Sequence, residues 1–323
     1  MKRYALKVFL LLGLSVHFGC EKDELPKPFS GGPSVNTVQV NMGSDYANQL
    51  FFGLSSATII SQNNREIWDL GFSCAAGSRH IILNSSKYMA LSVTNETDLT
   101  AVSTSTPVEW IYDDPAGALD SLAFRDWELN KVYILDRGVS ITGQQIGKMK
   151  LQITAMDETG YTIQWAGTLN SLASQTAFIP RNGDYNFAFF SFNTNQTVSV
   201  EPPKNEWDLC FSSYTYVYDD GTPYLVTGVL SNRNLARVIE SELAFDEIDF
   251  TYAETATYTA DIDIIGYDWK FYDFDLATYV IQYDKVYVIK SVEGLYYKLR
   301  FLDFYDQNGN KGAPGFELQE IVP

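Results

Sequence analysis

The chain has 323 residues, with 23 Lys and Arg against 40 Asp and Glu, so its formal net charge at pH 7 is −17. This acidity excludes nonspecific nucleic-acid binding and disfavours adsorption to anionic lipid. Only 2 His are present, so metal sites built from several His and most His-based catalysis are excluded as well. The sequence has no phosphate-binding glycine loop, Gly-x-Ser-x-Gly elbow or dinucleotide-binding glycine pattern.

The first residues have the pattern of an export signal. A basic start precedes an apolar run over residues 8–16, which is too short to span a bilayer. The run leads to Gly19-Cys20, which is typical of a lipoprotein processing site where the cysteine is lipidated. We therefore predict a signal peptide over residues 1–19 and lipidation at Cys20. An ordinary signal peptide with an incidental cysteine is the alternative.

The segment after Cys20 indicates a tether. The acidic stretch 21–24 resembles the signal that sends some lipoproteins to the outer face of the outer membrane, although a solvated charged segment is the plainer interpretation. Prolines and glycines are frequent up to Ser34. Such a composition keeps a chain extended, so we predict an acidic, Pro- and Gly-rich tether over residues 20–35.

Beyond the tether the chain repeats itself. Three motifs recur at a nearly constant offset: Asp45-Tyr46, Phe51-Phe52 and Trp68-Asp69-Leu70 in the first half, and Asp184-Tyr185, Phe189-Phe190 and Trp207-Asp208-Leu209 in the second. Several matches at nearly the same offset indicate an internal duplication. We predict β repeat 1 over residues 36–172 and β repeat 2 over residues 173–323.

Both halves have the composition of β-strands interrupted by turns. Residues 149–154 and 297–302 alternate apolar and polar side chains, which predicts strands with one buried and one solvent-exposed face. We predict an all-β fold of antiparallel sheets built from two tandem homologous halves. Short helices are expected at most over 236–247 and, with a weaker signal, over 115–124. Two halves that share a sheet and two separate domains both remain open.

Two cysteines follow Cys20 in the chain. Cys74 and Cys210 occupy different places in the two repeats, so the sequence does not pair them. Buried free thiols are favoured over a disulfide.

Carboxylate pairs are the only resource for an enzyme mechanism. Asp261 with Asp263, and Asp273 with Asp275, have the spacing that puts two acids on one strand face. Paired carboxylates can catalyse glycoside hydrolysis, but acids on the solvated face of an acidic protein are the favoured interpretation.

A partial calcium-loop pattern lies near the end of the chain. It consists of Asp306, Asn308, Asn310 and Glu317, but Lys311 stands where such a loop requires glycine. A polar hairpin turn is the favoured interpretation.

Aromatic side chains are abundant, with 21 Tyr, 20 Phe and 6 Trp. Rings fill the cores of large β proteins, which accounts for most of them. The functional interpretation is a flat, apolar slot for a planar ligand or a sugar ring.

Four segments together resemble the HmuY family: residues 45–52, 68–72, 81–84 and 294–301. The resemblance implies an all-β lipoprotein that is anchored in the outer membrane and is not an enzyme. It further implies that the protein captures haem and passes it to a TonB-dependent receptor.

The best-known members of that family hold haem iron between two His side chains, which this chain cannot do because only His80 follows the leader. Other members use Met, so the resemblance suggests His80 and Met89 as haem ligands, with Met149 and Met156 as weaker candidates. A surface His and a core Met are the alternatives. Basic side chains such as Arg79 or Lys87 would have to offset the acidic field around the haem propionates.

Two other functions stay open. A surface module that binds glycan or protein would expose aromatic rings on a flat face and show no iron chemistry. A glycosidase that uses Asp263 or Asp275 is the more distant possibility.

Overall fold

The structure is a computed structural model that describes residues 33–233 and 235–323. The predicted signal peptide, Cys20 and most of the predicted tether lie outside the described residues. The residues from Pro33 to Pro323 form one compact unit. No helix in the described part of the chain is both long and apolar enough to cross a membrane.

The elements are strands with a few short helices. The strands are β1 (Asn36–Gln39), β2 (Asn48–Gly53), β3 (Thr58–Asn64), β4 (Leu70–Ser73), β5 (Ile81–Leu83), β6 (Ala90–Val93), β7 (Val132–Asp136), β8 (Lys148–Asp157), β9 (Gly160–Ala166), β10 (Gln175–Pro180), β11 (Phe187–Ser191), β12 (Gln196–Val198), β13 (Leu209–Val217), β14 (Pro223–Ser231), β15 (Arg237–Ser241), β16 (Lys270–Asp273), β17 (Thr278–Ile281), β18 (Val286–Lys290), β19 (Tyr296–Tyr305) and β20 (Lys311–Ile321). The helical segments are η1 (Ser85–Lys87), η2 (Leu99–Ala101), η3 (Leu119–Ser121), η4 (Phe245–Glu247) and the α-helix α1 (Phe250–Thr255).

The strands form antiparallel sheets, so the prediction of an all-β fold is confirmed. Two sheets have five strands, in the orders β1-β20-β19-β18-β15 and β10-β9-β8-β7-β6. Two have four strands, in the orders β14-β13-β2-β3 and β12-β11-β4-β5. The hairpin β16–β17 forms a small sheet of its own.

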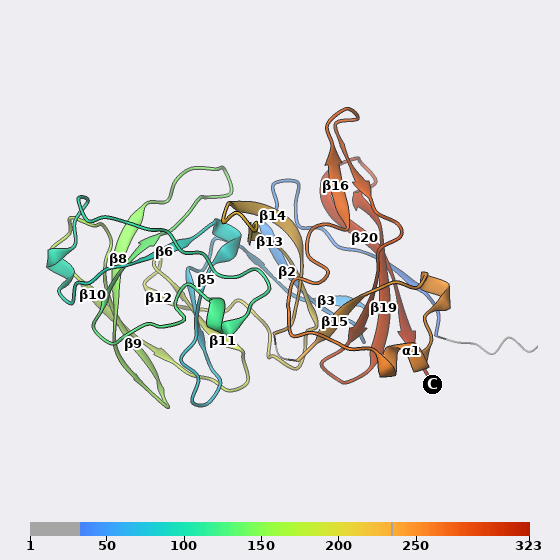
Figure 1. The fold of residues 1–323 in the computed structure, drawn as a ribbon, viewed down its shortest axis with the longest axis horizontal. Coiled ribbons are helices and arrows are strands. Elements are labelled where there is room, and N and C mark those ends of the chain that lie inside the picture. Colours follow the sequence, from blue (N-terminus) through green and yellow to red (C-terminus); the bar gives the residue numbers. More distant parts are fainter. Residues whose placement is uncertain (1–32, 234) are drawn as a thin grey trace, which may run out of the picture. The chain divides into compact units, whose positions relative to one another are not determined.

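The two halves of the chain exchange their opening strands. β1 and β2 open the first half, but they pair with β20 and β13 of the second. β10 and β11 open the second half, and they pair with β9 and β4 of the first. In Figure 1 the blue strands β2 and β3 accordingly accompany the gold strands β13 and β14. The halves therefore share sheets, and their predicted boundary near residue 172 stays a prediction about the repeats.

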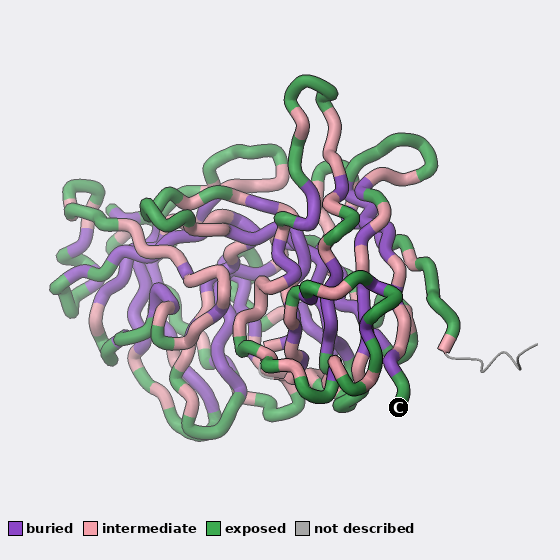
Figure 2. Tube along the Cα trace, turned by 45° about the vertical axis from the view of Figure 1, so that its right-hand side comes forward, coloured by how far each residue is buried: buried purple, intermediate pink, exposed green. Residues whose placement is uncertain are grey.

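Three apolar clusters hold the sheets together. One large cluster packs the strands β2, β13 and β18–β20, and the other packs β4, β7–β9 and β11. A smaller cluster contains Phe51, Trp68, Phe189 and Trp207. It lies between the two four-stranded sheets, on the faces that are turned away from the two large clusters. Figure 2 shows that the buried residues follow the strands and that the connecting loops are mostly exposed. Cys74 and Cys210 are both buried and free, as predicted.

The polar faces of β8 and β19 are more buried than predicted. Lys150 donates a hydrogen bond to the carbonyl of Val102, 2.9 Å away, just after η2. The Lys298 amine donates to the carbonyls of Phe245, at 2.7 Å, and Ile248, at 3.2 Å, around η4. The predicted solvent-exposed face is therefore wrong at these positions, because a short helical segment covers each lysine and accepts its hydrogen bonds.

Two further local predictions are wrong. Residues 236–247 contain β15 and η4 rather than one helix, because β15 pairs with β18 as an edge strand. Asp261 and Asp263 lie in a turn region rather than on a strand. Asp273 ends β16, and its carboxylate accepts backbone hydrogen bonds from Asp275 and Leu276, which closes the hairpin turn.

The aspartates of the repeated Trp-Asp-Leu motif fasten the exchange. Asp208 accepts a hydrogen bond from the backbone of Leu54, the residue after β2, at 2.8 Å. Asp69 accepts one from the backbone of Phe192, the residue after β11, at 2.7 Å. Each motif thus binds the strand end that the other half contributes. The Asn84 side chain also stabilises the first motif, because it donates hydrogen bonds to the carbonyls of Arg65 and Trp68.

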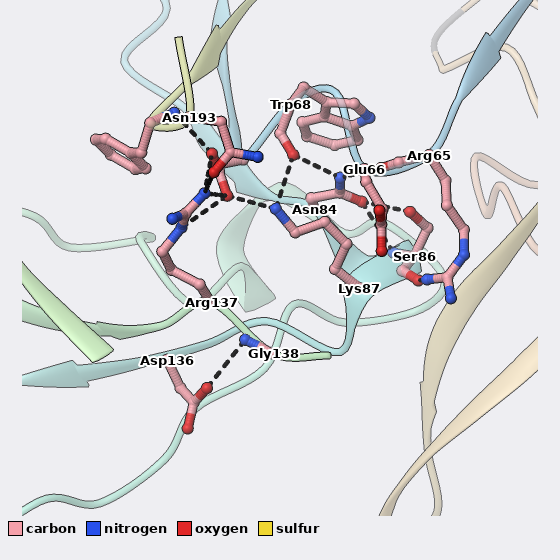
Figure 3. A network of polar contacts seen from close by, with 12 residues as sticks. Arg65, Glu66, Trp68, Asn84, Ser86, Lys87, Asp136, Arg137, Gly138 and Asn193 are labelled. Carbon is pink, nitrogen blue, oxygen red and sulfur yellow. Dashed lines mark hydrogen bonds and ion pairs between the residues drawn. The ribbon is translucent and has the colours of Figure 1, made fainter. Parts of the chain in front are cut away.

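The first motif carries an ion-pair network that the second lacks. Asp69 is fully buried and pairs with the equally buried Lys87 and with Arg137, whose Nη2 lies 3.0 Å from its Oδ2 (Figure 3). Asp208 accepts only backbone hydrogen bonds, from Leu54 and Val292, among the described residues. Removing one partner of a buried ion pair leaves an uncompensated charge, which costs about 3–5 kcal/mol.

This difference predicts unequal effects of the same substitution. Asp69→Asn should lower the free energy of unfolding by about 3–5 kcal/mol, because Lys87 would stay buried without a counter-charge. Asp208→Asn should cost about 1–3 kcal/mol, since it alters only hydrogen bonds to backbone amides. Urea unfolding of both variants at pH 7 measures the difference. Equal losses would contradict the assignment of the extra stability to the ion pairs.

Candidate functional site

The described residues contain a cavity of about 500 Å³ whose walls are rich in tyrosine. We call it the tyrosine cavity. This volume lies within the range of about 300–1,000 Å³ that is typical of small-molecule sites. Its aromatic lining residues are Tyr46, Tyr224, Tyr267, Phe271, Tyr272 and Tyr279.

The strand exchange builds this cavity. Tyr46 and Arg65 flank the exchanged hairpin β2–β3, so they belong to the first half of the chain. β14 and the hairpin β16–β17 supply the opposite lining from the second half, and the first-half loop 139–143 adds a further wall. No single repeat contains all of these groups.

The cavity opens to the surface. Tyr224, Phe271 and Tyr272 line it and are also exposed. Beyond them, the turn of the β16–β17 hairpin leaves Phe274 87 % and Leu276 67 % exposed. A ligand can therefore reach the aromatic walls from the side on which this hairpin lies.

Tyr46 brings an unsatisfied hydroxyl to the cavity. The oxygen is buried and has no hydrogen-bond partner among the described residues. Burial raises the pKa of this phenol, and the neighbouring Tyr279 raises it further. Buried polar atoms are nearly always paired, so this hydroxyl is an exception. Because protein atoms cover the oxygen, it could contact a ligand only after the Tyr46 side chain turns toward the cavity.

Lys270 is a second polar group in the cavity wall. Its side chain is only 5 % exposed, and its amine donates hydrogen bonds to the carbonyls of Thr227, at 2.7 Å, and Tyr267, at 3.4 Å. The amine also lies 4.2 Å from the centre of the Trp269 ring. Burial lowers the pKa of Lys270 to about 7, because desolvation disfavours the charged amine.

Arg65 is the third polar group in the cavity wall. It is 4 % exposed, it donates a hydrogen bond to the carbonyl of Ser86, and its Nε atom has no partner among the described residues. Desolvation lowers the pKa of its guanidinium. Asp45 and Asp268 also line the cavity, but both are exposed, and Asp268 is paired with Lys285 at 2.8 Å. The desolvated charges of the cavity are therefore positive.

The sequence-predicted haem ligands lie elsewhere. His80 is half-buried, accepts or donates a hydrogen bond at 2.9 Å to Ser78, and borders a separate polar pocket with Arg125, Asp126 and Arg233. Burial lowers the pKa of His80, as do the nearby Arg233 and Arg79.

Met89 is 1 % exposed and packs in the apolar core of the first half, together with Met149. Met156 packs against the edge of the same core. The described lining of the tyrosine cavity contains no His or Met. The structure therefore does not bring His80 and Met89 to one ligand-sized cavity, and their role as ligands stays a prediction.

The basic residues expected to offset propionate charge are also engaged. Lys87 is fully buried and paired with Asp69, so it is not available to a ligand. Arg79 is exposed but stacks 4.3 Å from the centre of the Trp127 ring. Arg65 and Lys270 are the buried basic residues that line the tyrosine cavity. Lys270 lies between Trp269 and Phe271 in the sequence, but Arg65 has no aromatic neighbour there, so no sequence signal singled it out.

The partial calcium loop forms a hairpin turn between β19 and β20. Asp306 accepts hydrogen bonds from the backbone of Asn308 and Asn310, and Glu317 pairs with Arg300 at 2.6 Å. Among the described residues, no group of three or more His, Cys, Asp and Glu side chains has the arrangement of a metal site.

A second, smaller cavity of about 130 Å³ lies between the two four-stranded sheets. Its lining includes Trp68, Trp207, Asp113 and Glu201. Glu201 is 5 % exposed and accepts hydrogen bonds from Phe187 and Asn186, with no cation within ion-pair distance among the described residues. Desolvation raises the pKa of Glu201 to about 7 and that of Asp113 to about 6. The space suits a single small ring or a few waters rather than a large planar ligand.

Comparison with known proteins gives the family. The family model described as "HmuY protein" matches residues 45–181 and again residues 183–318. None of the curated proteins matches the chain. Apo PinO from Porphyromonas gingivitis is 10 % identical over 90 % of this chain and 98 % of its own, with a TM-score of 0.34. The apo HmuY analog of Tannerella forsythia is 8 % identical over 91 % and 98 %, also with a TM-score of 0.34.

The raised pKa of Glu201 predicts a pH-dependent stability. Between its ordinary value of 4.5 and about 7, the folded state holds a proton that the unfolded state releases. Stability from this group is therefore present below pH 4.5 and is lost as the pH rises towards 7. Relative to Glu201→Gln, the native protein should lose about 3 kcal/mol of unfolding free energy between pH 4.5 and pH 8.

Urea unfolding across this pH range measures the loss. Glu206→Gln, at an exposed neighbouring position, is the matched control and should run parallel to the native protein. A constant difference between native protein and Glu201→Gln would show that the carboxyl titrates normally.

Proposed function

Because the chain belongs to the HmuY family, we propose that it is a non-enzymatic, haem-binding lipoprotein that hands haem to a TonB-dependent receptor. Its anchor is the lipid on Cys20, and its folded part stands at the outer face of the outer membrane. The family is one of binding proteins rather than enzymes. The tyrosine cavity is the observation that carries the proposal.

The lining of this cavity suits haem in three respects. Its volume of about 500 Å³ is that of a small-molecule site, and its walls are aromatic. Stacked rings favour a planar macrocycle. Its phenol oxygens include that of Tyr46, which lacks a partner among the described residues. Bound haem would supply an iron that a tyrosine oxygen could ligate.

Tyr46 is therefore our first choice for the group that contacts iron. The other phenols of the cavity, those of Tyr224, Tyr267, Tyr272 and Tyr279, would pack against the macrocycle. The cavity also suits haem better than the surroundings of His80 do, because half of the residues that line the pocket beside His80 are charged and none of the others is aromatic except His80 itself.

The alternative is a surface module that binds glycan or protein. The exposed rings of Phe274 and Tyr283, together with Leu276, favour it, because exposed aromatic groups contact sugars and partner proteins. These residues lie beyond the cavity, so the two functions can be separated by substitution.

Haemin titration into residues 21–323 tests the proposal. We expect a saturable, sharpened Soret band at one equivalent. Tyr46→Phe should weaken binding by about tenfold or more and shift the band, because the phenol oxygen is removed. Tyr185→Phe, the corresponding position in the second repeat, lies outside the cavity and should leave the titration unchanged.

Other outcomes would place haem at a different site or exclude haem binding. Loss of the band in His80→Ala or Met89→Ala, with Tyr46→Phe unaffected, would place haem at the sequence-predicted ligands. No spectral change beyond that of free haemin would exclude haem. Polysaccharide binding that is lost in Phe274→Ala would then support the glycan-binding alternative.

A further inference from the structure

Five basic side chains are buried in the described part of the chain: Arg65, Lys87, Lys150, Lys270 and Lys298. Three of them are committed to the interior. Lys87 pairs with Asp69, while Lys150 and Lys298 donate to carbonyls around short helical segments. The other two, Arg65 and Lys270, line the tyrosine cavity.

Arg65 and Lys270 differ from the other three in their position, because both line a cavity that opens to the surface. Like Lys150 and Lys298, neither has a carboxylate within 4.0 Å among the described residues, and the Nε atom of Arg65 also has no hydrogen-bond partner there. Burying an uncompensated charge is costly, so proteins normally pair such groups. Two unpaired cations in one aromatic cavity of an acidic protein indicate a site that an anion completes.

We propose that the tyrosine cavity recognises planar aromatic ligands that carry carboxylates, and that Arg65 and Lys270 bind those carboxylates. The inference rests on the proposed function for the location of the site, but it names the ligand groups that the cavity selects. A guanidinium offers paired N–H donors to a carboxylate, and a lysine amine offers a point charge. The aromatic walls hold the ring system between them.

The corresponding position of the second repeat is engaged elsewhere. Arg65 follows β3, and the corresponding residue of the second repeat, Lys204, instead donates to the carbonyl of Gly183 at 2.6 Å. Lys270 comes from the second half, and Arg65 is the one basic residue that the first half contributes to the described lining. Among the described residues, the second repeat therefore does not reproduce this pair of basic groups at the equivalent position.

Metal-free protoporphyrin IX and its dimethyl ester test the inference on the native protein. They share one ring system and differ in the two carboxylates, so no variant is needed. Fluorescence titration should show the diacid binding at least about tenfold more tightly than the ester. Equal affinities, or no binding of either porphyrin, would overturn the inference.

Variants assign the carboxylate contacts. Lys270→Met and Arg65→Met should each reduce the preference for the diacid while leaving the affinity for the ester within about twofold. Lys298→Met removes a buried lysine outside the cavity, and it should retain the full preference. A preference that survives in both cavity variants would overturn the role of these residues.

The pH dependence of diacid binding gives an independent readout. Lys270 faces Tyr267, Asp268 and Tyr279, and it shares the cavity with Tyr46, Arg65 and Asp45. Among these groups the amine titrates near pH 7, and a bound carboxylate favours its protonated form. Diacid affinity should be about tenfold weaker at pH 8 than at pH 6, and Lys270→Met should abolish that change. The same pH change in Lys270→Met as in the native protein would overturn the role of Lys270.

The two proposals fail separately. If the protein binds haemin but does not prefer the diacid, the proposed haem function is supported and the proposed carboxylate contacts are contradicted. Diacid preference without an iron-dependent Soret change would keep the carboxylate site and remove iron ligation.

Discussion

The pairing of each Trp-Asp-Leu motif with a strand from the other half is the interaction on which the fold depends. The backbone N–H groups of Asp69 and Asp208 donate to the carbonyls of Phe190 and Phe52, and their carboxylates accept from the residues after the same strands. Each opening strand is thus held at its end by the repeat to which it does not belong. If these contacts failed, both four-stranded sheets would lose their central pairing.

The exchange also explains the division of labour between the repeats. Equivalent scaffold positions keep the same contacts: Asn84 and Asn232 each donate to two carbonyls beside their own motif. The differences gather at charged positions. Asp69 acquires two cations and Asp208 none among the described residues, while Arg65 is buried at a cavity and Lys204 is bound to a nearby carbonyl. A duplicated scaffold that keeps its backbone contacts is free to specialise one copy of a position.

The sequence was sufficient for the features that local patterns encode. The strand composition, the repeated motifs and the non-equivalent cysteines led to the right fold class, the matched halves and the free thiols. Alternation misled at Lys150 and Lys298, because a period of two shows which side chains share a face but not what later covers that face. The strands that pair with β1 and β10 could not be predicted for a similar reason, since pairing between distant strands leaves no local pattern in the sequence.

For the same reason, the sequence could not identify the residues that line the tyrosine cavity. Tyr46 was visible as part of a repeated dipeptide, but Arg65 and Lys270 acquire meaning only when the exchange brings β3, β14 and the β16–β17 hairpin around one cavity. His80 and Met89 were chosen for their chemistry alone, because the sequence does not show that Met89 packs in the apolar core or that His80 borders a polar pocket. Their role as ligands stays a prediction.

The electrostatics of the chain follow from this arrangement. A net charge of −17 repels anionic ligands, but dissolved salt screens most of that repulsion beyond about 10 Å. Inside the cavity the balance is reversed, because the acids that border it are solvated whereas Lys270 and Arg65 are desolvated. An acidic surface and an anionic ligand are therefore compatible, provided that the cations are buried where the ligand binds. The exposed Arg79 cannot provide that advantage, since water weakens its field as effectively as it weakens that of the surrounding carboxylates.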